Sequence, residues 1–191
     1  MRTLLVLGAG GHGKAVADSA LSGKEWQRVV FADDRWPALQ DCFNTDVVSD
    51  ITEIGKLKGS VQGAIAAVGD NRRRQAWTAL IESAGIDLVS ILHPRSVVSN
   101  SANIYPGCAI MANAVVGADA VIGRGAIVNA GAIVDHDASL GDFAHLGVGV
   151  QLAGGVSIGA GAWLQAGCCA GYSVVVEENS VIAPGTALSI S

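Results

Sequence analysis

The chain has 191 residues, of which 50% are apolar and 15% charged, and its net charge is −5. This composition favours a folded chain with a sizeable core and argues against disorder. The acidic balance argues against non-specific binding to nucleic acid, which needs clustered Lys and Arg side chains. The basic run Arg72-Arg73-Arg74 is interpreted as the solvated start of a helix.

Cysteine usage and the N-terminal residues indicate where the protein acts. Cys42, Cys108, Cys168 and Cys169 lack metal-ligand spacing, so we expect reduced thiols and no bound metal. The apolar run from Leu4 to Leu7 is too short for a signal peptide or a membrane span. We therefore expect a soluble, cytoplasmic protein without a membrane partner.

Residues 1–94 alternate short apolar runs with helical patterns. Strands and helices that alternate in this way are typical of a small Rossmann-like parallel sheet covered by helices. In chain order, the pattern predicts a strand at Thr3–Leu7, a glycine-rich turn at Gly8–Gly13, a helix at Lys14–Leu21, strands at Val29–Phe31 and Ala64–Val68, a helix at Arg72–Ser83 and a last strand at Val89–Leu92.

The glycine-rich turn has the pattern Gly8-x-Gly10-x-x-Gly13 between the first strand and the first helix. Backbone N–H groups at such a helix N-terminus can hold phosphates. Asp33 and Asp34 follow at the spacing expected for a ribose or base contact. A tight turn without a ligand is the alternative. A dinucleotide-dependent enzyme is less consistent with the sequence, because this half supplies one mononucleotide unit and no residues for hydride transfer.

From Val98 onward the apolar residues recur every six positions. Four residues after most of these positions stands a small residue, such as Cys108 or Ala114. A helix with 3.6 residues per turn would lose this frame, whereas a β-helix gives each unit one short strand and one turn. We therefore predict a β-helix of hexapeptide repeats over residues 95–191. Sixteen positions hold the frame, fifteen of them Ile, Leu or Val: Val98, Ile104, Ile110, Val116, Ile122, Val128, Val134, Leu140, Leu146, Leu152, Ile158, Leu164, Ala170, Val176, Ile182 and Leu188.

One turn of the repeat departs from the others. Asp135, His136 and Asp137 occupy positions that elsewhere hold Gly, Ala or Asn. An imidazole titrates near neutral pH, so His136 is a candidate general base. The alternative is an exposed turn histidine flanked by acids that hold the turn backbone. For Asp135 we favour this turn role.

The order and spacing of these motifs resemble the bacterial nucleotide-linked amino-sugar N-acetyltransferases, which are related to sialic-acid O-acetyltransferases. The resemblance covers nearly the whole chain. It rests on Gly8-Ala9-Gly10-Gly11-His12-Gly13, Phe31-Ala32-Asp33-Asp34, Val68-Gly69-Asp70-Asn71, His93-Pro94 and Val134-Asp135-His136-Asp137.

The resemblance implies a left-handed, three-sided β-helix with about five coils. It further implies a homotrimer with active sites between neighbouring subunits, acetyl-CoA as cosubstrate, and a nucleotide-linked amino sugar bound by residues 1–94. Uridine is the first expectation for the nucleotide, before thymidine or guanosine. Family members usually continue into a Gly-x-Pro-Ala-Lys-like tail that helps to bind CoA. The sequence ends at Ser191 without this tail, so we expect a more open CoA site.

The resemblance also assigns roles to individual residues. His136 becomes the base and Asp137 the carboxylate that orients it. His145, Gly154 and Ala166 contact acetyl-CoA, and a backbone N–H near Gly154 is suited to stabilising an oxyanion. Structural roles in stacked turns remain open for each of them. The substrate-binding residues are Gly10, Gly11, His12, Asp33, Asp34, Gly69 and Asn129.

Three alternatives remain at this point. A hydroxyl acceptor would make the protein an O-acetyltransferase of the sialic-acid type, and the repeat domain alone does not exclude it. A dinucleotide-binding protein and a non-catalytic scaffold are the others. For the amine acceptor we expect direct transfer, because no Cys or Ser is placed as a nucleophile near His136.

Overall fold

The computed structural model describes residues 1–189 and divides into two compact units, Met1–Ile91 and the residues from Leu92 onward. Within the described residues, no helix has both the length and the apolar character needed to cross a membrane. All four cysteines are free thiols, as expected. Residues 190 and 191, which belong to the predicted repeat frame, lie outside the described residues.

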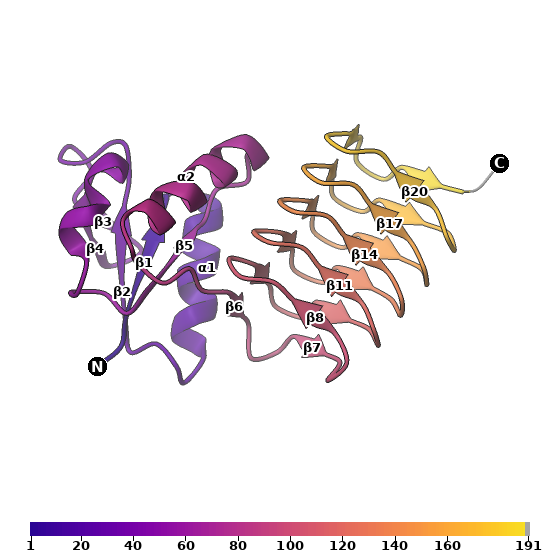
Figure 1. Cartoon of the computed structure of the whole chain (residues 1–191), viewed down its shortest axis with the longest axis horizontal. Helices are drawn as coiled ribbons and strands as arrows, with labels where there is room; N and C mark the ends of the chain where they lie inside the picture. Colours follow the sequence, from indigo (N-terminus) through magenta and orange to yellow (C-terminus); the bar gives the residue numbers. More distant parts are fainter. Residues whose placement is uncertain (190–191) are drawn as a thin grey trace. The chain divides into compact units, whose positions relative to one another are not determined.

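The first unit is a five-stranded sheet with helices packed on it (Figure 1). The strand order is β3-β4-β2-β1-β5, and all neighbours are parallel except β3 and β4. The central strand β1 is completely buried, which explains its uninterrupted apolar run. The elements are β1 (Thr3–Leu7), α1 (Gly11–Ser22), β2 (Arg28–Ala32), β3 (Asp41–Cys42), β4 (Thr45–Ser49), the 3-10 helix η1 (Ile51–Leu57), β5 (Gly63–Ala66) and α2 (Asn71–Ser83).

The structure confirms the first three predicted strands and both helices, and it corrects the sequence interpretation at two places. The hairpin of β3 and β4 was not predicted, and it makes the sheet mixed rather than parallel. The predicted last strand, Val89–Leu92, does not extend this sheet. Leu88 forms an isolated bridge with Ala64, whereas Ile91–Leu92 is strand β6 of the β-helix. Leu92 lies six residues before Val98, so the hexapeptide frame starts one repeat earlier than predicted.

The second unit is a left-handed parallel β-helix built from two-residue strands. Figure 1 shows its coils stacked along one axis. The strands are β6 (Ile91–Leu92), β7 (Val97–Val98), β8 (Asn103–Ile104), β9 (Ala109–Ile110), β10 (Val115–Val116), β11 (Val121–Ile122), β12 (Ile127–Val128), β13 (Ile133–Val134), β14 (Ser139–Leu140), β15 (His145–Leu146), β16 (Gln151–Leu152), β17 (Ser157–Ile158), β18 (Trp163–Leu164), β19 (Cys169–Ala170), β20 (Val175–Val176), β21 (Val181–Ile182) and β22 (Ala187–Leu188).

Each strand pairs with the strand one coil later. Val98 pairs with Val116 and Val116 with Val134, so one coil advances the chain by 18 residues (116 − 98 = 18). Three sheets result, one for each side of a prism. From β7 onward, the second residue of each strand points into a continuous core, together with the residue four positions later, such as Ala132 or Cys168. The predicted frame, its inward positions and its three units per coil are confirmed.

Candidate active site

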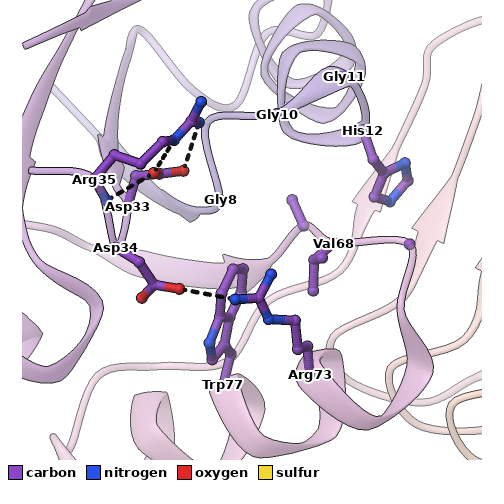
Figure 2. A pocket seen from close by; sticks show the side chains of 12 residues that line it. Gly8, Gly10, Gly11, His12, Asp33, Asp34, Arg35, Val68, Arg73 and Trp77 are labelled. Atoms are coloured by element: carbon purple, nitrogen blue, oxygen red, sulfur yellow. Dashed lines mark hydrogen bonds and ion pairs between the residues drawn. The ribbon is translucent and has the colours of Figure 1, made fainter. Parts of the chain in front are cut away.

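A pocket of about 370 Å³ opens at the carboxyl ends of the strands in the first unit. Its wall contains all six residues that the sequence assigned to the nucleotide in this unit, namely Gly10, Gly11, His12, Asp33, Asp34 and Gly69. Figure 2 shows the start of α1 on one side and Asp34, Arg73 and Trp77 opposite. The structure therefore gathers residues that are far apart in the sequence around one cavity.

The glycine-rich turn has this shape because two glycines leave no room for side chains. Gly8 has φ of +105°, and a Cβ there would lie 2.9 Å from the Trp77 ring. A Cβ at Gly13 would collide with the Gly8 carbonyl oxygen. The turn thus brings α1 close to the end of β1. The first N–H groups of a helix have no partner within it, so the N-terminus of α1 is suited to an anionic group such as a phosphate.

The Asp33 side chain stabilises the pocket wall through hydrogen bonds. Its carboxylate accepts hydrogen bonds from the Ala9 N–H at 2.7 Å and from Arg35 Nε at 2.6 Å. It also accepts from the Arg35 backbone N–H and from Arg35 Nη2, both at 3.1 Å. Burial alone would raise the pKa of Asp33, but the bonds from Arg35 and Ala9 outweigh it and lower the pKa to about 2. Asp33 is therefore a buried carboxylate that fixes the glycine-rich turn.

The helix α2 contributes residues that the sequence interpretation missed. Arg73 lines the pocket, forms an ion pair with Asp34 at 3.2 Å and lies over the Trp77 ring at 5.5 Å. Arg74 is only 1% exposed and donates to the carbonyl oxygen of Val68 at 3.0 Å. The interpretation of this basic run as solvated was therefore wrong for Arg74 and incomplete for Arg73. Only the wider contacts of the fold reveal these roles, because three consecutive arginines point in different directions from a helix.

His136 lies at a corner of the prism, in the turn after β13. Its Nδ1 atom is 2.7 Å from Asp137 Oδ2, and 54% of its side chain is exposed. The hydrogen bond with Asp137, followed by the charge of Asp135, raises the pKa of His136 above 6.5. Asp135 accepts a hydrogen bond from the His136 backbone N–H at 2.8 Å, which confirms its turn role.

Gly154 lies against the His136 ring from the next coil. A Cβ at position 154 would be 2.6 Å from His136 Nε2, so only glycine leaves space for the ring as placed. The Gly155 N–H also donates to the His136 carbonyl oxygen at 3.0 Å. With Nδ1 bonded to Asp137, the ring has Nε2 left for a substrate. This corner therefore combines an exposed imidazole, an orienting carboxylate and a glycine backbone.

The other predicted residues of this unit lie elsewhere on the prism. His145 belongs to strand β15, is buried, and stacks on Trp163 with ring centroids 5.6 Å apart. Asn129 and Ala166 follow strands β12 and β18, at a different corner from His136. The Asn129 side-chain oxygen accepts a hydrogen bond from the N–H of the next residue, Ala130. Within this chain, His136, Asp137 and Gly154 meet, whereas His145, Asn129 and Ala166 do not join them.

The chain is similar to known proteins in sequence and in structure. Residues 3–81 match the family model described as the PglD N-terminal domain. A crystal structure of a histidine-to-asparagine variant of perosamine N-acetyltransferase from Caulobacter crescentus, with CoA and GDP-perosamine, is 32% identical. It superimposes with a TM-score of 0.92 over 99% of this chain and 91% of that one. The chain belongs to the family of nucleotide-linked amino-sugar N-acetyltransferases.

Two further relatives of this N-acetyltransferase family are similar to the chain. The acetyltransferase domain of PglB from Neisseria gonorrhoeae, solved with acetyl coenzyme A, is 34% identical. Its TM-score is 0.92 over 98% of this chain and 93% of that one. UDP-N-acetylbacillosamine N-acetyltransferase from Bacillus subtilis is 30% identical over 114 residues. That alignment spans 59% of this chain and about half (52%) of the curated relative.

The contact between Gly154 and His136 leads to a first prediction. In Gly154→Ala the exposed ring can swing away, so we expect kcat/KM for acetyl transfer to fall by about tenfold to a hundredfold. The midpoint of thermal unfolding should barely change, because the displaced atoms belong to a flexible side chain. Acetyl-CoA kinetics and thermal melting measure the two effects.

Gly117→Ala is the matched control for this variant. Its Cβ would lie 2.7 Å from the backbone nitrogen of His136, which cannot move without disturbing the coil. This variant should lose stability. Equal losses of stability in both variants would show that Gly154 serves the coil rather than the imidazole.

The buried carboxylate of Asp33 gives a prediction for stability. We expect Asp33→Asn to lower the free energy of unfolding by roughly 1–3 kcal/mol at pH 7, because buried donors lose a charged acceptor. The pKa of Asp33 is lowered from 3.8 to about 2, so its contribution is present above pH 3.8 and is lost as the pH falls through 2. Urea denaturation at several pH values measures it.

Asp46→Asn is the control for Asp33→Asn, because Asp46 forms an exposed ion pair with Arg28. This variant should change the stability by less than about 1 kcal/mol. A loss from Asp33→Asn that persists unchanged near pH 2 would contradict the role given to the Asp33 charge.

Proposed function

We propose that the protein transfers the acetyl group of acetyl-CoA to the amine of a nucleotide-linked amino sugar, with His136 as general base. The pairing of His136 Nδ1 with Asp137 at an exposed corner carries the proposal. Support comes from the relatives at 32–34% identity, which were solved with CoA and GDP-perosamine or with acetyl coenzyme A. A second C. crescentus structure, again with CoA and GDP-perosamine, has a histidine replaced by alanine.

The chemistry requires a neutral amine and a place for its proton. The amine nitrogen attacks the carbonyl carbon of the thioester, and its proton passes to His136 Nε2. The bond between carbon and sulfur then breaks, and the CoA sulfur leaves with the bonding electrons and takes up a proton from the imidazolium. Asp137 holds the ring orientation and stabilises the charge that it carries between these steps. No covalent acetyl-enzyme forms in this scheme.

The positions of the predicted residues favour an assembly with shared sites. His136 and Gly154 lie at one corner of the prism, whereas Asn129 and Ala166 follow strands of another sheet. Within one chain, acetyl-CoA bound by His145 and Ala166 would lie on a different part of the prism from the turn that holds His136. A neighbouring subunit can supply the second set of residues directly. We therefore propose a homotrimer in which each site combines His136 of one chain with His145 and Ala166 of the next, acting in the cytoplasm.

The proposed function predicts a large effect of His136→Ala. We expect kcat to fall by about 10²–10⁴-fold with little change in the KM for acetyl-CoA, because the base acts on the amine and not on CoA binding. The assay follows thiol release from acetyl-CoA across a panel of nucleotide-linked amino sugars. Activity that survives this substitution unchanged would exclude His136 as the base.

Mixed assemblies of His136→Ala and His145→Ala chains test whether the sites are shared. Some sites in such assemblies contain both intact histidines if the residues come from different subunits, so activity should reappear on mixing. Activity that stays absent, although light scattering shows a mixed trimer, would contradict shared sites. A hydroxyl acceptor acetylated faster than any amine would instead favour the O-acetyltransferase alternative.

The pH dependence of kcat/KM tests the contribution of Asp137. Asp137 raises the pKa of His136 above 6.5, so the base becomes protonated early as the pH is lowered. Wild-type activity should therefore begin to fall while the pH is still above 6.5. In Asp137→Asn this acidic limb should move to lower pH, and the maximal rate should fall. Asp142→Asn, which changes an exposed carboxylate at another corner, is the control and should leave the limb in place. An acidic limb unaffected by Asp137→Asn would contradict the role of this pair.

A further inference from the structure

The pocket of the first unit contains two adjacent acidic residues, Asp33 and Asp34, which differ in how far they are accessible to a ligand. Asp33 receives hydrogen bonds on both oxygens, from Ala9 and Arg35, and is only 6% exposed. The Asp34 side chain is 48% exposed and contacts only one partner at hydrogen-bond distance within residues 1–189, Arg73. A ligand in this pocket therefore meets the Asp34 carboxylate, whereas the Asp33 carboxylate is occupied by the protein itself.

Arg73 offers donors beside this carboxylate. Its guanidinium lies over the Trp77 ring, and Trp77 is itself held against Gly8 at the end of β1. Figure 2 shows Asp34 and Arg73 side by side on the wall opposite the start of α1. The side chains of Arg73 and Asp34 are 61% and 48% exposed, so ligand groups can reach both partners. The pocket wall thus presents the two acceptor oxygens of Asp34 next to the N–H donors of the Arg73 guanidinium.

The opposite side of the pocket sets the orientation of a nucleotide. The N-terminus of α1, with Gly10 and Gly11, is suited to the diphosphate. The base then extends toward Asp34 and Arg73, across the cavity. The ion pairs Asp33–Arg35 and Asp34–Arg73 leave the pocket walls nearly neutral, so recognition of the base depends on matched hydrogen bonds rather than on net charge.

We propose, resting on the function proposed above, that this pocket selects guanine over uracil and thymine. Guanine carries two neighbouring donors, N1–H and the N2 amino group, which match the two oxygens of a carboxylate. Its O6 and N7 acceptors lie on the adjoining edge and match an arginine. The neighbouring positions of Asp34 and Arg73 correspond to these adjoining edges. Uracil and thymine present a single N–H donor between two carbonyl oxygens, so a carboxylate would gain one bond and face a repelled oxygen. The substrate nucleotide is then guanosine rather than the uridine expected from the sequence.

Calorimetric titration of the full chain with GDP, inosine diphosphate (IDP) and UDP tests this inference. Inosine lacks only the N2 amino group, so IDP isolates the second bond to Asp34. We expect GDP to bind roughly tenfold more tightly than UDP, with IDP between them. Equal or tighter binding of UDP would overturn the inference, although the proposed acetyl transfer would stand. Absence of binding by all three nucleotides would count against the proposed function itself.

Substitution of Asp34 separates a base contact from a ribose contact. Asp34→Asn replaces one acceptor by an amide donor, which suits xanthine because its C2 position carries an oxygen instead of an amine. We expect the variant to lose the preference for GDP over IDP and to bind xanthosine diphosphate better than the wild type does. An equal loss for GDP, IDP and UDP would assign Asp34 to the ribose and overturn the inference.

Arg73 and its neighbour Arg72 in α2 provide a variant and a matched control for the proposed contact with guanine O6 and N7. Arg73→Met should reduce the preference for GDP over UDP, because the donors to O6 and N7 are removed. Arg72→Met changes an exposed neighbour outside the pocket wall and should leave all nucleotide affinities unchanged. Circular dichroism of the variants checks that α2 is retained. A preference for GDP that survives Arg73→Met would contradict the contact.

Discussion

The parallel register between successive coils is the constraint on which the proposed chemistry depends. Because each coil advances the chain by 18 residues, every corner residue lies beside the residue 18 positions later. This relation brings Gly154 against His136 (154 − 136 = 18) and Trp163 against His145 (163 − 145 = 18). Hydrogen bonds between the strands of successive coils maintain this 18-residue offset. The repeat therefore determines which residues of the neighbouring coils lie beside an imidazole at a corner.

The first unit depends on a different kind of contact. Its pocket is held by polar bonds between residues that are distant in the sequence, such as the Asp33 carboxylate with the Ala9 N–H. Arg74 acts in the same way, because it donates to the backbone that leads from β5 to α2. A buried charge whose hydrogen bonds are satisfied fixes the geometry closely, whereas leaving it unpaired is costly. The groups left for a ligand are therefore those that the fold does not use itself.

The two units therefore differ in how far their structure could be predicted from the sequence. The β-helix was predictable down to its inward positions, because a strict period is a local property of the sequence. Only its start was placed late, since Leu92 follows Val89 within one apolar run. Six residues of the pocket wall were predicted from the resemblance, whereas Arg73 and Trp77 of α2 were not. The short hairpin Asp41–Ser49 has little apolar alternation, and nothing in the sequence indicates that Arg73 and Arg74 have opposite environments. Their roles arise from tertiary contacts that no local pattern records.

The neighbouring positions 73 and 74 show why the binding preference of this pocket can change independently of the fold. Arg74 is buried and bonded to the backbone, so replacing it removes a hydrogen-bond donor from the carbonyl groups of Val68 and Gly69. Arg73 is largely exposed and forms a surface ion pair, an interaction that contributes little to stability. A substitution at position 73 can therefore alter ligand recognition at small energetic cost, whereas a substitution at position 74 affects the loop itself. In a family whose relatives include proteins named for GDP-linked and UDP-linked substrates, such exposed positions are where differences in nucleotide preference can arise without loss of stability.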